Sequence, residues 1–230
     1  MAKSTLGKRS RGPFQSPQFR KKRKYSSFKR KIASYQAVEV KYVDTEFNGP
    51  VNKTLISAGT NFGPINLIAQ GDGNTQRDGR KCTVTSVHIK GYLEVQTDEI
   101  QAGTVRVAVV CDKQNNGSLS LPSDCFKNTT NAALYSCAFR NLEQTSQFRV
   151  LKDCTYTVSH HNSYYDSTNT APLKMEERIP IEINVSNLSI EVPFTGNTAA
   201  HGDINSNLIS VFVWSDNSSP ADLTAYLNCR

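Results

Sequence analysis

The sequence predicts an all-β fold, and two features of the chain indicate it. From about Tyr35 onward, short runs alternate apolar and polar residues with a period of two, as a strand with one buried face requires. Clusters of Gly, Asn, Asp, Ser and Pro, which are typical of turns, separate these runs. The 230 residues suit one or two domains by length, and a β-sandwich or barrel can use them all in one domain.

About eight alternating runs can be placed along the chain. In the clearest, residues 83–96, Val87 and Ile89 share one face of the predicted strand, while His88 and Lys90 share the other. The other seven are residues 37–47, 104–112, 148–158, 178–185, 188–194, 208–214 and 223–229. The predicted buried positions include Val87, Ile89, Val107, Val109, Val150, Ile181, Ile183, Phe212 and Trp214.

The spacing of these runs gives further expectations about architecture. Pro180 lies inside one run, and because proline cannot donate to a ladder, that strand is predicted at a sheet edge or at a bulge. Two connections are long, residues 48–80 and 113–147, and loops of that length usually form functional surfaces; the second is expected to hold a short helix at 131–142. Eight strands with unequal loops favour a single eight-stranded jelly roll over an immunoglobulin-like sandwich.

The N-terminal segment has a different composition. Residues 1–32 hold twelve of the 27 Lys and Arg residues and no Asp or Glu, so residues 33–230 carry 15 bases against 20 acids, a net charge of −5. Repulsion among like charges and the lack of apolar surface predict a disordered arm over residues 1–34, followed by a folded domain over residues 35–230. The candidate nucleic-acid-binding residues are Lys3, Lys8, Arg9, Arg11, Arg20, Lys21, Lys22, Arg23, Lys24, Lys29, Arg30 and Lys31.

The arm has the chemistry of a generic nucleic-acid binder. Lys and Arg neutralise phosphates and release counterions, and interleaved aromatic side chains can stack on unpaired bases without reading sequence. The arm's aromatic residues are Phe14, Phe19, Tyr25 and Phe28. Its two basic clusters also fit a bipartite nuclear localisation signal read by an import receptor, with candidate residues Lys8, Arg9, Arg11, Arg20, Lys21, Lys22, Arg23 and Lys24.

No motif indicates an enzyme, a metal site or a cofactor. The stretch "GDGNTQRDG", residues 71–79, lacks a third glycine at dinucleotide spacing and a Gly-Lys-Ser/Thr ending, so it is predicted to be a turn leading into the strand at Cys82. His160 and His161 are adjacent and would point to opposite faces of an extended chain, which poorly suits a shared metal. There is no Gly-x-Ser-x-Gly elbow.

The chain also lacks features of a membrane or secreted protein. No hydrophobic run approaches the length of a membrane span, and residues 1–32 have no apolar stretch like that of a secretory signal. We therefore expect the protein to be made in the cytosol or nucleus, without membrane insertion. Its six cysteines are expected to be reduced there, and not paired in disulfides.

A basic arm followed by a predicted jelly roll resembles the capsid proteins of small icosahedral viruses. Four stretches carry a closer resemblance: "LIAQGDGNTQRDGRKCTVTSVHIKGYLEV" (67–95), "VRVAVVCDKQNNGSLSLPSDCF" (105–126), "NLEQTSQFRVLKDCTYTV" (141–158) and "NLISVFVWSDNSSPADLTAYLNCR" (207–230). Their order and spacing are similar to those of capsid proteins of circular Rep-encoding single-stranded DNA viruses, and more distantly to geminivirus coat proteins. The chain lacks the cysteine and histidine metal element of some geminivirus coats, so plant-vector and movement roles are not carried over.

The resemblance implies a structural protein with no enzymatic activity. Its expected partners are other copies of the chain, about sixty or a small multiple in an icosahedral shell, and a packaged viral single-stranded genome. DNA, rather than RNA, is implied by the resemblance alone, as is residence in the virion and in the host nucleus during assembly. The alternative hypothesis is a cellular nuclear protein that binds single-stranded nucleic acid and has a β-barrel body. That class should show basic and aromatic residues on the barrel, whereas this body is net acidic.

Overall fold

Antiparallel β-sheet dominates the structure, which is a computed structural model of the chain. It describes residues 40–51, 61–95, 103–127, 136–158, 164–165, 172–173, 177–216 and 223–230. Residues Val40–Arg230 form one compact unit. Every pair of named strands in it is antiparallel, which confirms the prediction of an all-β fold.

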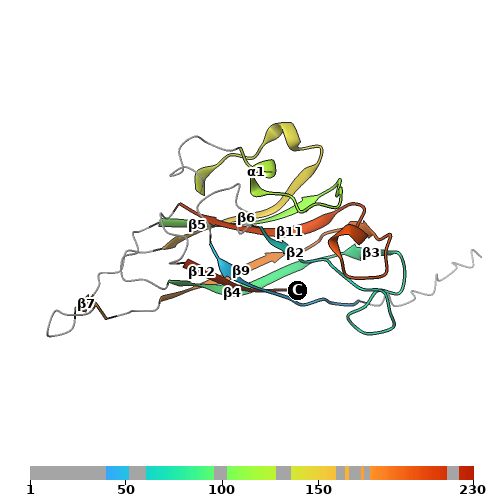
Figure 1. Cartoon of the computed structure of the whole chain (residues 1–230), viewed down its shortest axis with the longest axis horizontal. Helices are drawn as coiled ribbons and strands as arrows, with labels where there is room; N and C mark the ends of the chain where they lie inside the picture. The colour runs from blue at the N-terminus through green and yellow to red at the C-terminus, as the bar shows by residue number, and fades with distance from the viewer. Residues whose placement is uncertain are drawn as a thin grey trace, which may run out of the picture. The chain divides into compact units, whose positions relative to one another are not determined.

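Two four-stranded sheets face each other across the core (Figure 1). The first has the order β1-β12-β4-β9, with β1 at Thr45–Pro50, β12 at Leu223–Cys229, β4 at Val87–Val95 and β9 at Glu177–Val185. The second has the order β2-β11-β5-β6, with β2 at Asn61–Pro64, β11 at Leu208–Ser215, β5 at Gly103–Asp112 and β6 at Phe148–Val158. Pro180 lies in β9, the last strand of its sheet, as its missing N–H predicted.

The remaining elements are short. Two-stranded sheets join β3 (Lys81–Val84) to β10 (Ile190–Pro193), and β7 (Tyr164–Tyr165) to β8 (Pro172–Leu173). Twelve strands therefore occur among the described residues, compared with about eight predicted. The four additional strands, β2, β3, β7 and β8, have four residues or fewer, which is too short for an alternating pattern to reveal.

The inner faces of the two large sheets bury the main apolar cluster. Alternate residues of β5, from Val105 to Cys111, belong to it, together with Ile89 and Leu93 of β4. Eight of the nine positions predicted to be buried are buried: Val87, Ile89, Val107, Val109, Ile181, Ile183, Phe212 and Trp214. The ninth, Val150, is only partly buried, because it lies on β6 at the edge of its sheet.

A second apolar cluster lies on the opposite face of the β2-β11-β5-β6 sheet. The described residues between β5 and β6, namely 113–127 and 136–147, form a covering segment over this face (Figure 1). Phe126 of the covering segment packs against Trp214 of β11, with ring centroids 5.0 Å apart. All eight residues of β11 are consequently buried, whereas a strand with one solvated face would alternate.

The helix in the covering segment differs in position from the prediction. Helix α1 spans Pro122–Cys125, and the short 3-10 helices are η3 at Leu142–Gln144 and η4 at His201–Asp203. Pro122 at the first helical turn and Asp124, whose carboxylate accepts from the Leu121 N–H at 2.8 Å, place the start of α1. The predicted helix at 131–142 is therefore wrong for residues 138–141, residues 136 and 137 form only a 3-10 turn, and residues 128–135 lie outside the described residues.

One buried arginine, Arg106, holds the covering segment against the sheet. Arg106 of β5 binds Asp153 of β6 through two hydrogen bonds of 2.7 Å, and its remaining nitrogen donates to the carbonyls of Ser136 and Ala138 at 3.1 and 2.6 Å. The guanidinium also lies over the rings of Phe126 and Trp214. Arg106 is only 9% exposed, so these partners must offset the free-energy cost of burying its charge.

Gly91 is required where β4 passes β12. A Cβ built at Gly91 would lie 1.9 Å from the carbonyl oxygen of Tyr226, a backbone atom that cannot move without shifting β12. We expect Gly91→Ala to lower the free energy of unfolding by about 1 to 3 kcal/mol, as overpacking does. Gly79→Ala is the matched control, because nothing lies within 4 Å of its Cβ. Equal urea midpoints for the two variants would contradict this expectation.

All six cysteines are free thiols in the structure, including Cys137, which is exposed. Burial raises the pKa of Cys111 to about 11 and that of Cys229 to about 12, and it also raises the pKa of Cys125. For Cys111, a shift of this size lowers the thiolate fraction at pH 8 about a hundredfold. The three buried thiols should therefore resist modification in the folded protein.

We expect a maleimide or dithiopyridine reagent at pH 8 to modify Cys137 first, and Cys111, Cys125 and Cys229 only as the protein unfolds. Peptide mapping by mass spectrometry over time measures this order. Reducing agent should leave the melting temperature of freshly purified protein unchanged. A marked fall in melting temperature on reduction would show that disulfides are present.

Candidate functional site

The predicted nucleic-acid-binding residues, Lys3 to Lys31, and the predicted nuclear localisation residues all lie outside the described residues. The structure describes the chain from Val40 onward. Residues 40–44 lead into β1, which is an edge strand of its sheet. The candidate site is therefore the segment that precedes β1, residues 40–44, together with its contacts in the 70–79 loop and at Arg230.

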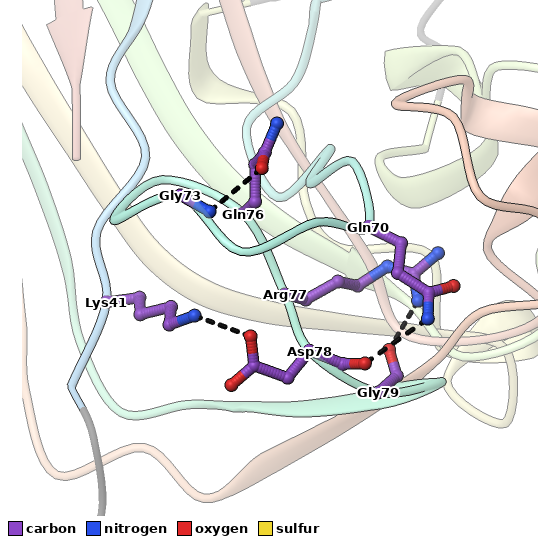
Figure 2. Close-up of polar contacts among 7 residues, drawn as sticks. All are labelled: Lys41, Gln70, Gly73, Gln76, Arg77, Asp78 and Gly79. Atoms are coloured by element: carbon purple, nitrogen blue, oxygen red, sulfur yellow. Dashed lines mark hydrogen bonds and ion pairs between the residues drawn. The ribbon is translucent and has the colours of Figure 1, made fainter.

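An ion pair fixes residue 41 to the glycine-rich loop. The Lys41 Nζ donates to the Asp78 Oδ1 at 2.8 Å, and Figure 2 shows the lysine reaching across to the loop from the segment before β1. The side chain of Lys41 is 19% exposed, while that of Asp78 is 66% exposed. A contact with one partner so exposed has a small energy, and its main effect is to direct the chain.

A second contact joins the same segment to the C-terminus. The Arg230 guanidinium makes hydrogen bonds of 2.6 and 2.7 Å to the two carboxylate oxygens of Asp44. It also stacks on the ring of Tyr42, 4.5 Å from the centroid. The bond from Arg230 lowers the pKa of Asp44. Residues 41, 42 and 44 thus each contact a side chain from another part of the chain. These contacts fix the position of the segment before β1.

The 70–79 loop is organised by one buried arginine. Arg77 is 4% exposed and donates to three carbonyl oxygens, those of Ile68, Gly79 and Gly196, the first at 3.0 Å. Its guanidinium also lies 4.1 Å from the centroid of the Phe194 ring. Figure 2 shows Arg77 between Gln70 and Gly79, inside the loop. Because Arg77 is buried and each of its three nitrogens donates to a backbone carbonyl, its role is to hold the loop together.

The loop leads into β3, which contains Cys82, so the prediction of a turn before that strand agrees with the structure. Gln76 closes the turn by accepting from the Gly73 N–H at 2.9 Å (Figure 2). A Cβ at Gly71 would lie 2.1 Å from the Gln76 Oε1, so the glycine makes room for this contact. Sequence reasoning found the turn but missed Arg77, because one of its partners, Gly196, is 119 residues away.

Two turn carboxylates, Asp112 and Asp216, act as local acceptors. Asp112 accepts hydrogen bonds from the Gln114 N–H and the Ser120 hydroxyl, at 2.9 and 2.7 Å, and Asp216 accepts from the Thr104 N–H at 2.6 Å. Within the part of the chain that the structure describes, no three His, Cys, Asp or Glu residues are grouped to hold a metal ion. His160 and His161 lie outside that part.

Comparisons with known proteins add no relative. No protein-family model matches the chain, and no curated protein matches it significantly in sequence. Among the described residues, no helix is long and apolar enough to cross a membrane.

Proposed function

We propose that this chain is the capsid protein of a small icosahedral virus of the circular Rep-encoding single-stranded DNA class. In this proposal the body, residues 35–230, is a jelly-roll shell domain that assembles with other copies of itself. Residues 1–34 bind the single-stranded genome inside the shell and carry the nuclear localisation signal. The protein has no catalytic role, and it resides in the virion and, during assembly, in the host nucleus.

The order of strand pairing supports the jelly roll. Five antiparallel pairs are nested along the chain: β5 with β6, β4 with β9, β3 with β10, β2 with β11, and β1 with β12. Nested pairs of this kind make one long antiparallel ribbon. Two further pairs, β12 with β4 and β11 with β5, join distant parts of the ribbon side by side, as happens when the ribbon rolls up into two four-stranded sheets.

The distribution of charge supports packaging by the arm. Twelve bases without an acid precede a body of net charge −5, so attraction for a polyanion is concentrated at one end of the chain. The body is then free to make lateral contacts with other copies. With about sixty copies, the arms would bring roughly 720 positive charges to a genome that has one negative charge per nucleotide.

The observation that carries the proposal is the nested strand ribbon attached, at an edge strand, to an arm of this composition. Purified full-length protein is expected to elute as megadalton particles in size-exclusion chromatography and to appear as closed shells in negative stain. Nuclease treatment followed by extraction should recover protected single-stranded nucleic acid, whose sequencing identifies the packaged strand. A persistent monomer or dimer, under conditions where the protein is folded, would contradict the proposal.

One feature favours the alternative, a cellular nuclear protein that binds single strands. Tyr92 of β4 and Tyr226 of β12 stack with centroids 4.9 Å apart, and Arg178 lies over the Tyr92 ring at 4.9 Å. The same face has acidic residues, since Arg178 contacts Glu94 at 3.6 Å and Lys90 contacts Glu182 at 3.7 Å. An aromatic pair across two strands is also an ordinary stabilising contact in sheets, so we retain the capsid as the first proposal.

A further inference from the structure

A cavity in the covering segment has the lining of an anion site. Eight residues line a cavity of about 240 Å³, among them three cations, Lys113, Arg140 and Arg149, and no acidic residue. The polar groups of Asn141 and Thr145 complete the lining. Three positive charges around one cavity repel one another, and an anion bound among them would offset this repulsion.

The three cations are held on well-anchored backbone. Lys113 directly follows β5, where its N–H donates to the Gln147 carbonyl at 2.8 Å and its Nζ donates to the Thr145 carbonyl at 2.9 Å. Arg149 is the second residue of β6, and its backbone pairs with Cys111 of β5. Arg140 is in an isolated bridge with Phe126. Hydrogen bonds within the protein therefore fix the backbone at all three positions.

The three cavity cations also lack the carboxylate partners that most other described cations of the body have. Six described cations pair with carboxylates: Lys41, Lys81, Lys90, Arg106, Arg178 and Arg230. Among the described residues, neither Lys113, Arg140 nor Arg149 has a carboxylate partner. Asp112, next to Lys113, has its carboxylate occupied by Gln114, Ser120 and Gln147.

We propose that this cavity binds a tetrahedral oxyanion, a phosphate or sulfate group. The guanidinium groups of Arg140 and Arg149 can each present two parallel N–H donors to such a group, and the ammonium of Lys113 keeps two donors beyond its bond to Thr145. The cavity is larger than one oxyanion, so it accommodates part of the molecule that carries the group. The proposal concerns the body alone, and its test does not depend on the function of the arm or on shell assembly.

The test compares two double variants of the full-length chain that lose the same charge. Arg140→Gln with Arg149→Gln removes two cavity cations, whereas Arg80→Gln with Lys152→Gln removes two exposed cations outside the cavity. Isothermal titration with inorganic phosphate, at constant ionic strength in chloride, should give a Kd at least tenfold higher for the cavity variant. The control variant should bind like the wild type, because the arm is the same in all three proteins.

The melting temperatures of the variants in chloride show whether they are folded. If the cavity double variant melts early, Arg140→Gln and Arg149→Gln are measured singly, and each should weaken phosphate binding about threefold or more. Inorganic sulfate, a nucleoside monophosphate and a monosaccharide sulfate are the further probes that distinguish a free anion from an ester. Equal phosphate affinity in the wild type and the cavity variants, or equal loss in the control, would overturn the proposal.

Discussion

Deletion of residues 1–32 is expected to remove most of the salt-dependent binding of single-stranded nucleic acid. The deletion removes twelve of the 27 bases and changes the net charge from +7 to −5. If six to ten arm cations contact phosphates, affinity of the full-length protein should fall about 10³-fold to 10⁵-fold between 50 and 200 mM salt. The truncated protein should bind weakly, with a shallow slope, and its particles should lack nucleic acid.

Fluorescence anisotropy with a labelled oligonucleotide, repeated over a salt series, measures this slope. A matched variant replaces Phe14, Phe19, Tyr25 and Phe28 with leucine and keeps all twelve cations. It should preserve the salt slope while lowering affinity at every salt concentration, because stacking on bases is lost. A reporter fused to residues 1–32 should enter nuclei. Equal packaging by truncated and full-length proteins would refute the role assigned to the arm.

Arg106→Met is expected to be the most destabilising of the proposed single substitutions in the body. It leaves the Asp153 carboxylate, 18% exposed, without its partner and removes the donor from the carbonyls of Ser136 and Ala138. Loss of one member of a buried pair costs about 3 to 5 kcal/mol. The chain has one tryptophan, Trp214, next to Arg106, so loosening of the covering segment should also shift its fluorescence to the red.

Urea unfolding of the full-length protein in high salt measures this change. Lys81→Met is the control, because the Lys81–Glu191 pair also joins two strands but has side chains 66% and 61% exposed. An exposed pair contributes about 1 kcal/mol or less, so this control should differ little from the wild type. If Arg106→Met and Lys81→Met had similar unfolding midpoints, the covering segment would not depend on Arg106.

The contrast between strands and loops explains how much could be predicted. Alternation identified the strands because a strand with one buried face has a period-two pattern that is visible within its own sequence. The missing N–H of Pro180 is likewise a local property, and it predicted a sheet edge or a bulge; β9 is an edge strand. Strands such as β2, with four residues, were missed because their pairing depends on a distant partner, β11.

The roles of the buried arginines could not be predicted by the same reasoning. In the run 104–112, alternation places Arg106 on the face away from the main core, which usually means solvent. Its burial results from residues 136–138, thirty positions later, which fold back over that face. The cavity cations Lys113, Arg140 and Arg149 are similarly dispersed in sequence and are brought together only by the covering segment.

The contact between Arg230 and Asp44 brings the two ends of the body together. Arg230 also exchanges backbone hydrogen bonds with His88, so the C-terminal residue is held in place along β4 and beside the start of β1. A peptide or small protein fused after Arg230 would therefore leave the body beside Asp44, at the start of β1. If the chain forms the proposed shell, such a fusion would emerge on the side of the shell where residues 40–44 lie.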